Sequence, residues 1–299
     1  MSRHHEVHLR GYVLLLVAAL LYGTYGVWSR LMGDTFPPFY QAWTRGILIV
    51  MMMLPYLLWT HSIRKIERED WGFFTVYLLL TACTQAPLYY AFNNAPIGTV
   101  QLIFYATLVI TTYLFAKFYV GEIITRVKML AMIIAFIGLV CVFGTSVLIF
   151  APLGLSLAVF NGFASGGEMT STKRIPEKYS SALVAWYGWV FIVPTHLVLS
   201  IIFEKQVGFQ FDAAWGWLAL YALVNMAAFW LGLVGYRLID ASIASLIGLL
   251  EILFAIVFGR IIFEESLRSG IYIGGLLIIV AAMLPDVVRL MDRRRGSKL

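Results

Sequence analysis

Ten long apolar segments dominate this sequence, and each is long enough to cross a membrane. A spanning helix needs ~20 mostly apolar residues, and it must be helical because lipid offers no hydrogen-bond partner for the backbone. Charged residues make up 13% of the chain, whereas a soluble domain usually carries about 25%. We therefore predict an all-α polytopic membrane protein with ten transmembrane helices. The predicted spans cover residues 11–33, 38–60, 72–92, 96–120, 127–146, 149–171, 181–203, 214–236, 241–263 and 269–290.

The two halves of the chain share a repeated segment. Residues 71–122 and 215–265 both open with Trp-Gly, carry a Tyr five residues after that Gly, and end on a Glu. A repeat spaced by about half the chain indicates that one unit was doubled. We expect a first five-helix repeat over residues 1–147 and a second over residues 148–299.

An odd number of spans in each unit fixes how the units are related. The second unit must enter the bilayer from the opposite side to the first, so the repeats are inverted. Inverted repeats place a site between them near the middle of the membrane, and exchanging their conformations exposes that site to either side. This symmetry favours a transporter.

Lys and Arg are distributed unequally between the two sides of this topology. With a cytoplasmic N-terminus, seventeen of the 22 Lys and Arg residues lie on or near the cytoplasmic side. The five on the other side are Arg30, Arg45, Lys205, Arg260 and Arg268. Because cytoplasmic loops are enriched in Lys and Arg, both termini are expected in the cytoplasm.

Motifs of enzymes and metalloproteins are missing from the sequence. HExxH, GxGD and GxSxG do not occur, so an intramembrane hydrolase has no visible chemistry. Cys83 and Cys141 lie in apolar segments, where they are expected to pack rather than to form a disulfide or bind a metal. The basic residues do not share a face with interleaved aromatic rings, which argues against nucleic-acid binding. We expect no enzyme activity, no cofactor and no metal.

Polar and aromatic residues inside the spans are the candidates for contact with a solute, because such groups should face the protein interior or a wet cavity. Together they predict a lining that is polar, mostly uncharged and rich in rings, which suits a small zwitterionic or amphipathic solute. The alternative for the rings is the aromatic belt at the membrane interfaces. The predicted substrate-binding residues are Gln85, Tyr89, Gln101, Tyr105, Asn161, Trp186 and Asn225.

Two acidic residues and three prolines complete the candidate machinery. Glu168 and Glu251 lie deep in spans, and we consider them for coupling export to proton entry; the alternative is a fixed structural partner. Pro55, Pro87 and Pro194 interrupt helical spans and are candidate hinges. The alternative for each proline is a static kink.

The chain resembles the EamA type of the drug/metabolite transporter superfamily, from Gly11 to Leu290. Within that superfamily it is most similar to the YddG-type exporters of aromatic and other neutral amino acids. The resemblance rests on the doubled five-helix unit and on two segments, Ala95-Pro96-Ile97-Gly98-Thr99-Val100 through Gly121-Glu122, and Ser242-Ile243-Ala244-Ser245 through Leu250-Glu251-Ile252 to Glu264-Glu265.

The resemblance implies a bacterial inner-membrane exporter whose substrates are small amino acids such as Phe, Tyr and Trp. Its other partner is membrane lipid, and a monomer is compatible with the sequence. Three alternatives stay open: export of other small metabolites or drugs, a nucleotide-sugar carrier, and a lipid scramblase or membrane enzyme using the same cavity. A nucleotide-sugar carrier would favour a more cationic cavity than Arg45 supplies.

Overall fold

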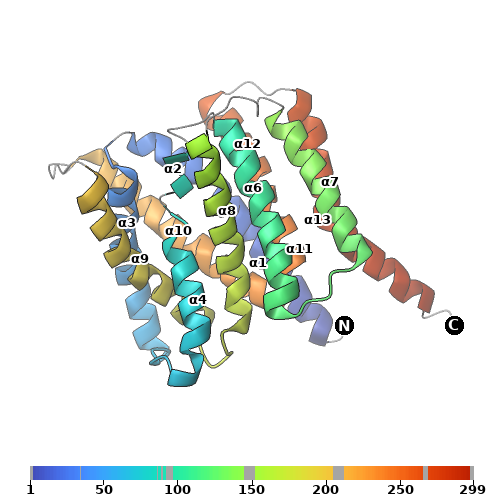
Figure 1. The fold of residues 1–299 in the computed structure, drawn as a ribbon, viewed down its shortest axis with the longest axis horizontal. Helices are drawn as coiled ribbons and strands as arrows, with labels where there is room; N and C mark the ends of the chain where they lie inside the picture. Colours follow the sequence, from blue (N-terminus) through green and yellow to red (C-terminus); the bar gives the residue numbers. More distant parts are fainter. Residues whose placement is uncertain are drawn as a thin grey trace.

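The computed structural model describes residues 3–33, 35–85, 87–88, 90–91, 97–144, 152–204, 212–264 and 269–296. Within these ranges the chain is helical with short connections and contains no strand. The first half supplies α1 (Arg3–Gly23), α2 (Tyr25–Met32), α3 (Pro38–Trp59), α4 (Trp71–Ala82), α6 (Ile97–Leu114) and α7 (Arg126–Phe143). The second half supplies α8 (Pro152–Ser171), α9 (Ser181–Phe203), α10 (Ala213–Leu238), α11 (Ala241–Gly248), α12 (Leu250–Phe263) and α13 (Ser269–Gly296) (Figure 1).

Most of these helices meet the requirements of a membrane span. Among the described residues, eight helical segments are long and apolar enough to cross a bilayer. Two of the ten predicted spans are not among these eight segments. One is α8, which carries the polar residues Asn161 and Glu168, and the other is α4, which ends early at Ala82. Large apolar side chains such as those of Phe118 and Ile261 are exposed on the outside of the bundle, as expected of a surface solvated by lipid. The protein is an all-α polytopic membrane protein.

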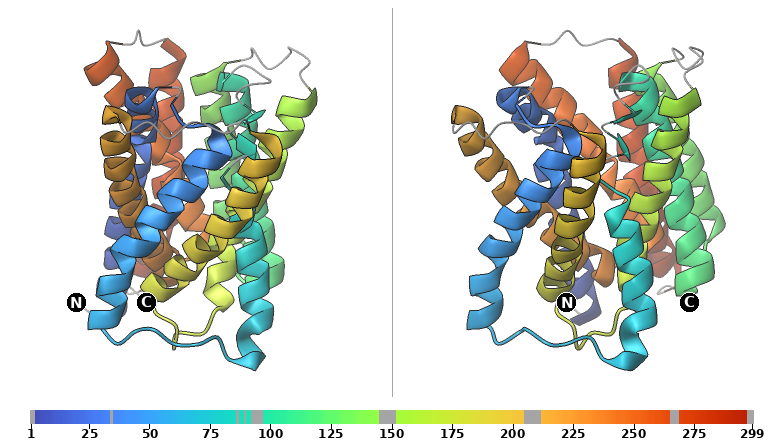
Figure 2. Two further views of the ribbon diagram at one scale, coloured as in Figure 1. Left: turned by 90° about the vertical axis from the view of Figure 1, so that its left-hand side faces the viewer. Right: turned by 60° about the vertical axis from the view of Figure 1, so that its left-hand side comes forward.

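The two repeats run in opposite directions. Both chain ends lie at the same end of the molecule, which we call the terminal face (Figure 2). Helix α1 starts at this face and runs away from it, whereas α8 starts at the opposite end, called the far end here, and runs toward it. The five-helix repeats are therefore inverted, as their odd number of spans requires.

The repeats are interleaved rather than side by side. Helix α1 packs on α10, α11 and α12 of the second repeat, and α8 packs in the equivalent way on α4 and α6 of the first. The remaining large contacts join equivalent helices, α3 with α9 and α7 with α13. Each repeat's first helix thus belongs to the other repeat's packing unit, so a movement of one repeat displaces both walls of any space between them.

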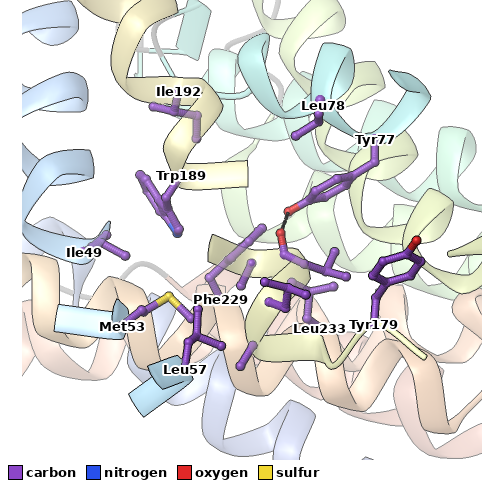
Figure 3. Close-up of a cluster of buried hydrophobic side chains, with 14 of the residues drawn as sticks. Ile49, Met53, Leu57, Tyr77, Leu78, Tyr179, Trp189, Ile192, Phe229 and Leu233 are labelled. Carbon is purple, nitrogen blue, oxygen red and sulfur yellow. Dashed lines mark hydrogen bonds between the residues drawn. The ribbon is translucent and has the colours of Figure 1, made fainter. Parts of the chain in front are cut away.

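The core that joins α3, α9 and α10 is built around the ring of Trp189, which packs among apolar side chains and also faces the Arg45 guanidinium, 5.8 Å from its centroid. Trp189 lies between Ile49 of α3 and Phe229 of α10, with its ring 6.1 Å from that of Phe229 (Figure 3). The Tyr77 hydroxyl of α4 donates a 3.1 Å hydrogen bond to the Val184 carbonyl of α9. Helices α3, α4, α9 and α10 are therefore held as one block.

Three of the predicted spans are not continuous helices, which corrects the predictions for residues 11–33, 72–92 and 241–263. The first breaks at Thr24 and the last at Leu249. At Thr24, the side-chain hydroxyl bonds the Leu21 carbonyl at 2.6 Å and accepts the Trp28 indole N–H at 2.8 Å. At Leu249, the preceding Gly248 has low helix propensity.

The middle break lies at residues 83–85, just before Pro87. A proline cannot donate a backbone hydrogen bond, and its ring clashes with the carbonyl four residues earlier, which here is that of Cys83. Asn161 of α8 accommodates the break, since its Nδ2 donates to the Thr84 carbonyl at 2.6 Å and to that of Cys83 at 3.4 Å. The predicted interruption by Pro87 is thus present, and a neighbouring helix bonds the freed carbonyls.

Candidate substrate pocket

A pocket of about 270 Å³ lies between helices of both repeats. Its walls come from the end of α1, from α2, α6 and α12, and from the last residue of α7. It reaches the surface beside α2, where the lining residues Gly26 and Arg30 are exposed. The lining residues are Gly23, Gly26, Val27, Arg30, Gln101, Tyr105, Phe143, Ile252, Ala255, Ile256, Gly259 and Phe263.

Two glycines shape the pocket in opposite ways. A Cβ at Gly23 would lie 3.0 Å from both the Ala255 nitrogen and the Glu251 carbonyl oxygen, so only a glycine lets α1 approach α12 this closely. A Cβ at Gly26 would meet nothing within 4 Å. Helices α1 and α12 are therefore in close contact at Gly23, whereas the space beside Gly26, about one turn further along, is open.

The part of the pocket wall that α6 forms carries polar groups. Gln101 and Tyr105, two of the predicted substrate-binding residues, are one helical turn apart and both line the pocket. The Tyr105 ring stacks against Phe143, with centroids 6.3 Å apart and planes 12° apart. Its hydroxyl interacts with the Glu251 carboxyl, which precedes the lining residue Ile252. This side of the pocket is thus aromatic, with an acid directly behind it.

The outer end of the pocket carries a cation that sequence reasoning missed. The Arg30 guanidinium carbon lies 4.6 Å from the centroid of the Phe263 ring, and both residues line the pocket. The available signal was that Arg30 is one of the few basic residues on the side away from the termini. That count was used for topology and not for the site.

The two candidate coupling acids are brought near a common tyrosine. Tyr22, at the end of α1, interacts electrostatically with both Glu168 and Glu251. Glu168 is 5% exposed on α8 and interacts with the Thr81 hydroxyl of α4. The structure therefore groups these acids deep in the bundle, and Glu251 is the one that adjoins the pocket.

Gln85 and Asn225 belong to a buried polar cluster beside the pocket. Arg45, 1% exposed, donates from Nη2 to Gln85 Oε1 at 2.5 Å, and its guanidinium lies 4.4 Å from the Tyr221 ring centroid. Tyr221 packs edge-on against Tyr25 at 4.9 Å, and Tyr25 accepts a short hydrogen bond from Asn225 Nδ2. Tyr25 lies between the pocket residues Gly23 and Gly26 in sequence, so this cluster adjoins the pocket without lining it.

The remaining predicted site residues lie elsewhere. Trp186 donates from its indole nitrogen to the Val50 carbonyl at 3.3 Å and packs at the margin of the α3, α9 and α10 core. Asn161 bonds the break in the third span, and Tyr89 lies outside the described residues.

The candidate hinges Pro55 and Pro194 are exposed within helices that continue through them. Pro87, the third candidate, follows the turn at residues 83–85. Only Pro87 is therefore next to a break in a span.

At the terminal face, an ion network joins the two repeats. Lys128 at the start of α7 bonds Glu122 Oε1 at 2.8 Å and Asp240 Oδ2 at 2.9 Å, and its side chain is 7% exposed. Glu122 also accepts the backbone N–H of Ala241 at 2.9 Å and the hydroxyl of Ser242, so it caps α11. Two first-repeat residues thus fix the start of a second-repeat helix.

A second network at the same face joins the connection that precedes α4 to the connection that precedes α9. Lys178 bonds Asp70 at 2.6 Å and Glu67 at 2.7 Å, and the Tyr179 hydroxyl donates to Asp70 at 2.8 Å. The Lys178 ammonium, together with the Tyr179 hydroxyl, holds the pKa of Asp70 below its usual range. The terminal face is therefore cross-linked at two places.

Comparisons with known proteins agree with this architecture. No curated protein matches the chain in sequence. A solved structure described only as "Crystal structure of protein" superposes with a TM-score of 0.79 at 15% identity, covering 93% of this chain and 98% of that chain. The model of the EamA-like transporter family matches twice, at residues 9–144 and 152–284. The chain belongs to the EamA-like transporter family.

Proposed function

We propose that this transporter exports aromatic and other neutral amino acids across a bacterial inner membrane by alternating access. The observation that carries the proposal is the contrast between the two ends of one space: a pocket that reaches the surface at the far end, and ion networks that tie both repeats together at the terminal face. A solute in the pocket has access to one side only. Inverted repeats can reverse that access by exchanging conformations.

The pocket suits a small solute with an aromatic or aliphatic side chain. Its volume of about 270 Å³ is slightly below the ~300–1,000 Å³ that is usual for ligand pockets, so it suits a small molecule. Phe143, Phe263 and Ile256 provide apolar contact, while Gln101 and Tyr105 provide polar groups. This combination supports neutral amino acids over nucleotide-linked or highly charged metabolites.

The distribution of basic residues supports a cytoplasmic terminal face. Lys128, Lys173, Lys178 and Arg237 all lie there, and seventeen of the 22 Lys and Arg residues are expected on that side. On this orientation the pocket faces outward, in the state from which an exporter releases its substrate. Loading from the cytoplasm then requires the Lys128 network to separate.

We further propose that Glu251 or Glu168 links export to proton entry. Glu251 adjoins the pocket through Tyr105, and Tyr22 interacts with both acids. Proton uptake at either carboxyl would change the charge beside the pocket during the cycle. Each acid is replaced by Gln in turn, and in at least one of the two variants the response of flux to an imposed pH gradient across the vesicles should be lost; a response unchanged in both variants would exclude coupling through these acids.

Counterflow of labelled Phe in proteoliposomes tests the proposed function. Vesicles preloaded with unlabelled Phe or Thr should accumulate label transiently, and Tyr105→Ala should reduce that accumulation. Tyr272→Ala is the matched control, because Tyr272 is 66% exposed on the outside of the bundle. If the vesicles show lipid flipping but no counterflow of any amino acid, the protein is a scramblase and the proposed export is wrong.

A further inference from the structure

Gly26 is a glycine that neither the packing nor the backbone of this protein requires. It is the second residue of α2, and a Cβ at this position would meet nothing within 4 Å. The described glycines with a positive φ are Gly33, Gly121 and Gly144, so Gly26 does not adopt a conformation that favours glycine. Glycine is also one of the poorest helix formers. Folding alone therefore does not explain a glycine here.

The position of Gly26 in the pocket wall distinguishes it from other glycines with open surroundings. The described glycines that combine an ordinary φ with open space around an added Cβ are Gly26, Gly72, Gly216 and Gly248. Gly72 and Gly216 lie in the first turns of α4 and α10, and Gly248 is the last residue of α11. Among these four, Gly26 is the one that lines the pocket. The open space beside it therefore adjoins the proposed substrate.

Gly23, about one turn earlier, shows what a structurally required glycine looks like in the same pocket. A Cβ at Gly23 would lie 2.6 Å from Phe254 Cβ and 3.0 Å from the Ala255 nitrogen. Small residues commonly allow such close approach of two helices in lipid. Helix packing thus accounts for Gly23 and leaves Gly26 without an equivalent reason.

We propose that Gly26 sets the upper limit on the size of the side chain that this transporter accepts. The pocket holds about 270 Å³, which is small for a ligand pocket, so a side chain added to its wall would displace part of a large solute. Phe143 and Phe263 line the same pocket and offer ring contacts. An aromatic solute then uses the space that the glycine leaves open, whereas a small solute such as Thr does not need it. This inference rests on the proposed amino-acid transport and deepens it, because it assigns acceptance of aromatic side chains to one position.

A graded series of substitutions tests this size limit. Counterflow of labelled Trp, Phe and Thr is measured in proteoliposomes for the wild type and for Gly26→Ala, Gly26→Val and Gly26→Leu. The ratio of the KM for Trp to the KM for Thr should rise along the series and increase by about tenfold in Gly26→Leu, because overfilling a packed space weakens binding by roughly this factor. The KM for Thr should stay within about twofold of the wild type.

Gly216→Leu is the matched control for this series. Gly216 is also exposed on a helix, has nothing within 4 Å of an added Cβ and does not line the pocket. Its ratio of the KM for Trp to the KM for Thr should equal that of the wild type. A change of the same size in Gly216→Leu would show that the effect does not come from the pocket, and would contradict the proposal.

Thermal unfolding in detergent separates an effect on the pocket from an effect on the fold. Gly26→Ala should melt no lower than the wild type, because Ala is the better helix former. Gly23→Ala should melt lower, because its Cβ would press against α12. A clearly lower Tm for Gly26→Ala would mean that the fold itself requires this glycine, which contradicts the proposal.

The outcomes distinguish this inference from the proposed function. Absence of Trp, Phe and Thr counterflow in the wild type contradicts amino-acid export itself. Wild-type counterflow with the same KM ratio in all three Gly26 variants contradicts only the size limit at Gly26. Equal loss of Trp and Thr transport in a folded Gly26→Leu variant also overturns the size limit, because the added side chain then blocks every solute regardless of its size.

Discussion

The two ends of this transporter are built from the same repeated unit, yet they have opposite structures. At the terminal face, Lys128 and Lys178 each bond two acids. Every ion pair found among the described residues lies at this face. At the far end, a pocket reaches the surface between α2, α6 and α12. An inverted repeat permits both arrangements at both ends, so under the proposed alternating access the difference corresponds to one state of the cycle.

The two ion networks at the terminal face should differ in strength. The Lys128 and Glu122 side chains are each 7% exposed. In the second network Asp70 is 8% exposed, but Lys178 is 30% and Glu67 53% exposed. Removing one partner of a buried pair leaves an uncompensated charge and costs far more than losing a pair that water can solvate. The Lys128 network is therefore the one whose separation should control opening of this face.

The largest expected effect comes from removing that lysine. Lys128→Met removes the cation that bonds the buried carboxylate of Glu122, while Asp240 keeps Arg289 at 3.6 Å, and should destabilise the protein by about 3–5 kcal/mol. Lys178→Met, the comparison variant, should cost less, because Lys178 and Glu67 are partly solvated by water in the folded protein. Thermal unfolding in detergent measures both. Equal losses in the two variants would show that the terminal face is not held mainly by Lys128.

At the far end, the aromatic inner wall is the most sensitive element. Tyr105→Ala removes the ring that stacks on Phe143 and the hydroxyl that interacts with Glu251. Loss of ring contact and one hydrogen bond should raise the KM for Phe by about tenfold, which corresponds to about 1.4 kcal/mol. Tyr105→Phe, which keeps the ring, should show a smaller rise. Unchanged flux in both variants would remove Tyr105 from the site.

The ends of the fourth helix in each repeat offer a smaller test. Gly121 and Glu264 both adopt left-handed backbone conformations, with φ of 85° and 56°. A non-glycine residue pays roughly 1–2 kcal/mol in this conformation, so Glu264→Gly should stabilise the protein by about 1 kcal/mol. The reverse change at the other end, Gly121→Ala, should destabilise it by a similar amount. Thermal unfolding of the pair shows whether the two ends are equivalent at this position.

The smallest expected effect is a pH dependence at the terminal face. The pKa of Asp70 is lowered in the folded protein by Lys178 and Tyr179, so its contribution to stability is present above the unfolded pKa of about 3.9 and is lost as pH falls through the lower folded value. The difference in melting temperature between wild type and Asp70→Asn should therefore shrink between pH 6 and pH 3. A difference that grows on acidification contradicts this sign.

Sequence reasoning identified the fold class, the inverted topology and two pocket residues for a clear physical reason. Lipid offers the backbone no hydrogen-bond partner, so the spans must be helical. An odd number of spans in each repeat means that the second repeat is inverted relative to the first. Gln101 and Tyr105 were found because polar groups on one face of a span usually point inward. The breaks at Thr24 and Leu249 were not predicted, since Thr and Gly are common in membrane helices and do not by themselves mark an interruption.

The same reasoning could not identify the partner of each buried polar group. Asn161 bonds carbonyls freed near Pro87, and Trp186 bonds the Val50 carbonyl. In the sequence, an amide or an indole inside a span looks the same whether its partner is a solute or the backbone. The Lys128 contact with Asp240 joins residues 112 positions apart. Such pairings depend on how the repeats interleave, which the hydrophobic pattern does not encode.

Cysteine accessibility at the two ends tests alternating access most directly. In a background with Cys83 and Cys141 replaced by Ala, Gly26→Cys reports on the pocket mouth and Ser242→Cys reports on the helix start capped by Glu122. Without substrate, a membrane-impermeant maleimide should label Gly26→Cys from the far side and leave Ser242→Cys unlabelled from the terminal side. During Phe counterflow, labelling of Ser242→Cys should rise while that of Gly26→Cys falls. Labelling of both positions that rises together, or does not respond to Phe, would contradict an alternating pocket.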